Sequence, residues 1–151
     1  MDKKILIGII VFVLIWLCLG LQVTFFNEVR LFGVSANIGI VLVAGLGLTS
    51  GKTSGAVTGA VYGFLMDILY GKSFGIYGLM YMLVGLVCGE FSNGFSKENK
   101  LSMVYIVAAM TVAFEVLTYL VFMLVYSYDF EFWYMLLIII KETIYNMILS
   151  R

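Results

Sequence analysis

Six long apolar blocks, separated by short polar turns, organise this chain. They lie at about residues 5–26, 35–49, 55–70, 74–91, 101–126 and 132–149. No polar stripe recurs every 3.6 residues within them, as it would on a helix that faces water. The second and third blocks would span only about 24 Å as helices, against a bilayer core of about 30 Å, so we expect short helices in the bundle interior or ends that extend into the turns. The pattern predicts one polytopic membrane domain over residues 1–151, all-α, with six transmembrane helices.

Composition supports a membrane protein and argues against several other classes. The chain is 63% hydrophobic and only 12% charged, whereas a soluble domain has about 45–50% apolar and about 25% charged residues. The net charge of zero lacks the basic footprint of a nucleic-acid-binding protein. The chain has no histidine, and its two cysteines lie inside apolar blocks, which argues against a metal or haem cofactor. No acid–base pair with a nucleophile is visible, so we expect no enzymatic activity.

Basic residues in the turns predict the orientation of the helices. The first block is longer than a signal-peptide core and lacks a small-x-small cleavage site, so we interpret it as a retained helix. With the N-terminus in the cytoplasm, two basic residues, Arg30 and Lys72, lie outside. The six on the inner side are Lys3, Lys4, Lys52, Lys97, Lys100 and Arg151. Both termini are therefore predicted to be cytoplasmic.

A ridge of small residues runs along the third block. Gly55, Gly59, Gly63 and Asp67 follow one another at intervals of four residues, which on a helix gives a single face that drifts by about 40° per step. In lipid, such a ridge lets another backbone approach closely. It either packs against the next helix of the same chain, whose glycines would absorb much of this surface, or receives a helix of another subunit.

Ionisable and amide side chains at membrane depth are the other candidates for function. The predicted buried polar network comprises Glu115, Lys141, Glu142 and Asn146. An unpaired charge at the bilayer centre costs at least about 2.5–3.5 kcal/mol, so Lys141 is expected to pair with Glu115 or Asp67. A proton or substrate pathway and a contact with a partner's membrane helix are the alternatives. The face of the fifth helix that we expect to point inward carries Ala108, Thr111, Glu115 and Thr118.

Several short motifs, taken in order, resemble the MreD family of rod shape-determining membrane proteins. They are the run from Asn37 to Leu42 (NIGIVL), Gly51 and Gly55, the run from Gly63 to Leu69 (GFLMDIL), Gly75, the run from Tyr81 to Gly85, and the pair Tyr145–Asn146. The resemblance covers most of the chain, since the length and the number of blocks also agree.

The resemblance implies a non-catalytic scaffold or regulatory subunit of the bacterial cell-elongation machinery, in the plasma membrane. The implied partners are membrane lipid and an MreC-like bitopic protein, and through the latter MreB, RodA and a class B penicillin-binding protein. The implied fold is similar to that of the substrate-binding components of energy-coupling-factor transporters. That fold leaves open a second hypothesis, a vitamin-type binding subunit of a transporter, and a lipid-handling protein is a third.

Overall fold

Helices account for nearly all the residues that the computed structural model describes, which are 2–28, 33–70, 74–94, 100–127 and 131–150. The α-helices are α1 Lys3–Gly20, α2 Phe26–Glu28, α3 Ile38–Ser50, α4 Lys52–Tyr70, α5 Ile76–Glu90, α6 Lys100–Tyr126 and α7 Phe132–Leu149. A π-helical turn, Leu21–Phe25, joins α1 to α2, and a 3₁₀ turn, Phe91–Asn93, follows α5. Within the described ranges the chain thus has six helical segments, with α1 and α2 counted as one, and the predicted all-α architecture is confirmed.

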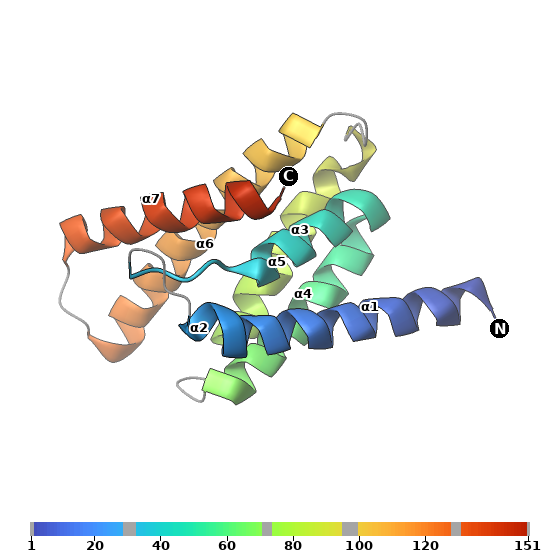
Figure 1. Cartoon of the computed structure of the whole chain (residues 1–151), viewed down its shortest axis with the longest axis horizontal. Coiled ribbons are helices and arrows are strands. Elements are labelled where there is room, and N and C mark those ends of the chain that lie inside the picture. Colours follow the sequence, from blue (N-terminus) through green and yellow to red (C-terminus); the bar gives the residue numbers. More distant parts are fainter. Residues whose placement is uncertain (1, 29–32, 71–73, 95–99, 128–130, 151) are drawn as a thin grey trace.

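Helices α3, α4 and α5 form the centre of the bundle, and α4 and α5 are its most extensively packed pair. Helices α6 and α7 pack on one another, and α6 also contacts α5 and α3. Helix α1 lies against α3 and α4, and in Figure 1 it runs along one edge of the bundle with its N-terminal part extending beyond these helices. The side chains of α1 that contact the core are Val11, Ile15, Cys18 and Leu19.

Among the described residues, four helical segments are long and apolar enough to cross a membrane: Lys3–Phe25, Ile76–Asn93, Leu101–Tyr126 and Phe132–Leu149. Helix α3 has 13 residues, about 20 Å at 1.5 Å per residue, which is shorter than the bilayer core. That α3 and α4 also cross the membrane stays a prediction. Together the four spans support a membrane-embedded protein.

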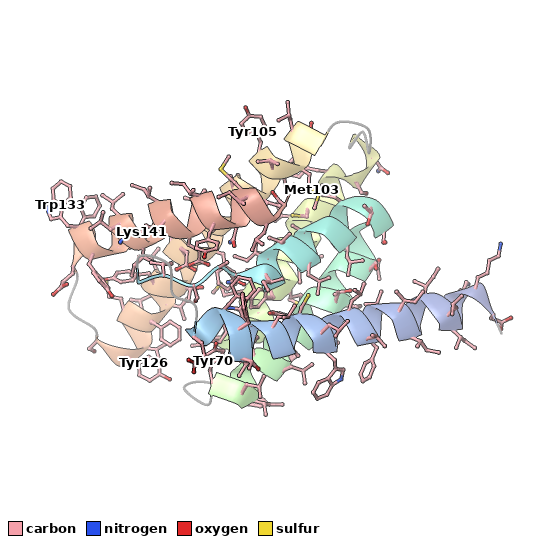
Figure 2. The ribbon with its side chains drawn as sticks, in the orientation of Figure 1. Tyr70, Met103, Tyr105, Tyr126, Trp133 and Lys141 are labelled. Carbon is pink, nitrogen blue, oxygen red and sulfur yellow. The ribbon has the colours of Figure 1, made fainter. Side chains whose placement is uncertain are left out.

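Exposed aromatic side chains mark both ends of the α6–α7 hairpin. Tyr105 lies near the start of α6, whereas Tyr126 ends that helix and Trp133 lies at the start of α7, and all three are exposed. Figure 2 shows Tyr126 and Trp133 at the end of the bundle opposite to Tyr105. Tyr and Trp are enriched at the two membrane–water interfaces, so this placement fits a hairpin that crosses the bilayer twice.

Glycines bring the backbones of α4 and α5 into direct contact. A Cβ atom added to Gly59 would collide with the carbonyl oxygen of Tyr81, and one added to Gly63 with that of Tyr77. In return, Gly85 of α5 faces the backbone of Gly55. The ridge on α4 is therefore occupied by α5 of the same chain, and the hypothesis that a partner's helix lies along it does not fit this geometry.

The tight contact predicts a large effect of a single methyl group. Gly59→Ala should lower the free energy of unfolding by about 1–3 kcal/mol, as overpacking does elsewhere. The measurement is a denaturant titration of the purified protein in detergent, followed by circular dichroism. Gly8→Ala on α1 is the matched control, since an added Cβ there meets nothing within 4 Å. Equal stabilities of the two variants would contradict the close α4–α5 contact.

Candidate functional site

Asp67 lies at the end of the glycine ridge and caps the next helix. It is only 2% exposed, and its carboxylate accepts three backbone N–H groups at 3.0 Å, from Gly75, Tyr77 and Gly78. These amides belong to the first turn of α5 and have no partner within that helix. The negative charge also meets the positive end of the helix dipole. Asp67 thus replaces the N-cap side chain that Gly75 lacks.

Asn37, at the start of α3, connects this helix to α5 and α7. Its side-chain oxygen accepts the hydroxyl of Tyr81 (α5) at 2.6 Å and the backbone N–H of Ile40 at 3.3 Å. Asn37 and Glu142 of α7 also line the same cavity. The backbone N–H of Asn37 donates to the side-chain oxygen of Asn146 at 2.9 Å. One short amide residue therefore fixes how α3 meets α5 and α7.

Asn146 and Gln22 extend this network to α6 and α1. Asn146 is completely buried and donates to the hydroxyl of Thr111 at 3.0 Å. Gln22, in the π-helical turn, donates to the carbonyl of Ala36 at 2.9 Å and accepts the N–H of Ile38 at 3.0 Å. In this way the side chain of Gln22 satisfies the backbone that leads into α3. We call the following set of side chains the polar cluster: Gln22, Asn37, Tyr81, Thr111, Glu115, Glu142 and Asn146.

Two carboxyl groups of the polar cluster lie against each other. Glu115 of α6 and Glu142 of α7 line the same cavity and interact through their side chains. Neighbouring carboxylates repel each other, so a proton or a cation between them would stabilise the pair. Lys141 is half-buried in the middle of α7 (Figure 2). Its pairing with Glu115 or Asp67 stays a prediction, although both carboxyls have the other partners described above.

A cavity of about 250 Å³ opens beside these carboxyl groups. Its lining residues come from the end of α1, the start of α3 and helices α4, α5, α6 and α7. They are Gln22, Ser35, Asn37, Met66, Tyr70, Tyr77, Tyr81, Phe114, Glu115, Thr118 and Glu142. The polar cluster and this cavity form the candidate functional site. Within the described part of the chain, no three or more His, Cys, Asp or Glu side chains gather as a metal site.

The sequence of the chain matches one known protein family over nearly its whole length. Residues 3–151 match the family model described as rod shape-determining protein MreD. The chain belongs to the MreD family. The resemblance expected from the sequence motifs is thus confirmed, and membership of the family makes this chain a membrane protein of rod-shape determination. No match to the chain was found among curated proteins or among solved structures, so the likeness to energy-coupling-factor components stays a prediction.

The structure of this MreD-family chain brings some predicted site residues together and adds others. Glu115, Glu142 and Asn146 meet in the polar cluster, whereas Asp67 lies apart at the start of α5. Gln22 was missed as a site residue, and Asn37 and Tyr81 were noticed only within family-like motifs. A lone amide inside the first apolar block, Gln22, was the signal in the sequence that could have pointed to a buried polar contact.

Removal of the Asp67 charge tests the cap of α5. Asp67→Asn should lower the free energy of unfolding by about 2 kcal/mol, because hydrogen bonds to charged groups contribute about 1.5–3 kcal/mol and the new NH₂ group cannot accept them. The same titration in detergent measures the change. Glu90→Gln, at an exposed ion pair with Lys52, is the control and should be nearly neutral. A neutral Asp67→Asn would show that the cap does not stabilise α5.

The bond between Tyr81 and Asn37 predicts a measurable coupling. Tyr81→Phe and Asn37→Ala should each destabilise, and their effects should not add. The coupling free energy should be about 0.6 kcal/mol and at most about 1.7 kcal/mol, the range found for such bonds in membrane proteins. A double-mutant cycle of unfolding titrations measures it, with Tyr134→Phe at an exposed position of α7 as the control. Purely additive effects would exclude the bond.

Proposed function

We propose that this chain is a non-catalytic scaffold or regulatory subunit of the cell-elongation machinery. It supports cell shape and lateral peptidoglycan synthesis by holding an MreC-like bitopic protein in the membrane, and through it MreB, RodA and a class B penicillin-binding protein. The observation that carries the proposal is the family match over residues 3–151. The buried polar side chains described above are engaged mainly in joining helices, which suits a structural role.

The N-terminal part of α1, which extends beyond α3 and α4 (Figure 1), is the surface that we assign to the partner. The glycine ridge of α4 is already occupied by α5, so it is not available. By contrast, Ile7, Phe12 and Trp16 are each more than half exposed, and only Ile15 and Leu19 of α1 are buried. Gly8 lies open on this helix, and a small residue lets a second helix approach closely in lipid.

The proposed orientation places both termini in the cytoplasm. The ends of α1, α4 and α6 that carry Lys3, Lys52 and Lys100 lie toward the same side of the bundle in Figure 1. This common side agrees with the bias of basic residues toward cytoplasmic turns. A bitopic partner with its own transmembrane helix could then lie parallel or antiparallel to α1 within the bilayer.

Co-purification with the MreC-like protein tests the assignment. Gly8→Leu should weaken recovery of the partner about five-fold or more, because overpacking a close contact costs about 1–3 kcal/mol. Val57→Leu, at an exposed position of α4, is the matched control and should leave recovery unchanged. Unfolding titrations should show both variants as stable as the wild type.

Cell shape provides the second readout. Cells without this chain should become round, the wild-type chain should restore rods, and Gly8→Leu should restore them only in part. Full recovery of both partner and shape by Gly8→Leu would exclude the contact through α1. Rod-shaped growth without the chain would contradict the proposed function itself.

A further inference from the structure

The cavity beside Glu115 and Glu142 has the size of a small ligand. Its volume of about 250 Å³ equals that of about eight water molecules at roughly 30 Å³ each. Pockets for drug-sized ligands begin at about 300 Å³, so a compact molecule or a lipid headgroup fits better than a large one. Its lining draws on six helical segments, and it lies where the end of α1, the start of α3, and helices α4, α5, α6 and α7 meet.

The chemistry of the lining favours a positive ligand. Glu115 and Glu142, from two different helices, both line the cavity. The described residues that line it include no lysine or arginine. Because an opposite charge stabilises neighbouring carboxylates, a cationic group that enters the cavity gains two acceptors at once.

Thr118 supplies an independent observation. This side chain lines the cavity, is only 9% exposed, and has a buried hydroxyl with no hydrogen-bond partner. Buried hydroxyls are normally satisfied by protein or by a bound molecule. Thr118 follows Glu115 by three residues on α6, so the two side chains share one face of the helix. The hydroxyl is therefore a third acceptor on the same side of the cavity.

Aromatic rings form the rest of the wall. Tyr70 and Tyr77 have ring centroids 6.4 Å apart, and Tyr81 and Phe114 have centroids 4.7 Å apart. Faces of such rings attract cations and accommodate apolar atoms. A ligand with a small cationic head and a short apolar stem matches both parts of the lining.

We propose that this cavity binds a primary ammonium group, which donates its three N–H bonds to Glu115, Glu142 and Thr118. A primary ammonium has three donors and no acceptor, in agreement with three acceptors that lack a basic neighbour in the lining. The group comes either from the headgroup of an amine lipid or from a free small amine. This site is additional to the scaffold function and does not depend on it.

Ethanolamine hydrochloride tests the free amine. It should raise the unfolding temperature of the full chain in detergent by several degrees in a saturable manner, as a ligand of the folded state does. Choline chloride, at the same ionic strength, carries the same charge without N–H donors and should have a much smaller effect. No shift with ethanolamine and none in the lipid experiment, or equal shifts with choline, would overturn the proposal.

Nanodiscs test the lipid source. Phosphatidylethanolamine should raise the unfolding temperature relative to pure phosphatidylcholine, and native mass spectrometry should find it retained on the protein after detergent extraction. A response to the lipid alone assigns the ammonium to a headgroup, and a response to ethanolamine alone assigns it to a free amine; either result supports the site.

Variants separate the site from general stabilisation. Glu115→Gln, Glu142→Gln and Thr118→Val should each reduce the ethanolamine or lipid response at least several-fold, whereas Glu90→Gln should retain it. If the site variants respond like the wild type, the proposal is wrong. If a site variant fails to fold, the comparison of ethanolamine with choline on the wild-type chain still decides.

Discussion

Close backbone contact between α4 and α5 is the constraint on which the rest of the structure depends. Apolar burial does not favour helix pairing in lipid, so short-range packing and polar contacts decide it. Gly59 and Gly63 bring α4 against α5 in one register, and that register places Asp67 over the first amides of α5. The same contact positions Tyr81, whose hydroxyl reaches Asn37. A wider separation would leave both groups without their partners.

The hydrogen bonds of the polar cluster fix how the other helices are arranged around α4 and α5. In a medium of low dielectric constant, each buried polar group loses much if its partner is removed. Asn37 joins α5 and α7 through its side chain and its backbone N–H, and Asn146 joins α3 and α6 through its side chain, so a rotation of α3, α5 or α7 would break several bonds at once. The side-chain amide of Asn146 has hydrogen-bond partners through its oxygen and its nitrogen, whereas the buried hydroxyl of Thr118, on the cavity side, has none.

The helices were predictable because a long apolar stretch in a membrane protein forms a helix of nearly the same length. Block 132–149 coincides with α7, and block 101–126 differs from α6 by one residue. The inward face of α6 was also predictable from the helical period, since Thr111 and Thr118 are buried. The hydrogen-bond partners of side chains on different helices were not predictable, because they depend on how each helix is rotated about its axis. Asp67 shows the limit most clearly, since its partners are backbone amides, which no residue type reveals.

The two proposed contacts of this MreD-family chain use different parts of α1. Its N-terminal part, where Ile7 and Phe12 are exposed, extends beyond α3 and α4, and a partner's helix would lie against it. At its other end, in the π-helical turn, Gln22 forms hydrogen bonds to the backbone of Ala36 and Ile38 and lines the cavity. A ligand in the cavity and a helix on α1 therefore do not compete for space. In the proposed orientation the cavity lies nearer the outer leaflet, so an amine headgroup or a free amine would enter from that side while the partner approaches within the plane of the bilayer.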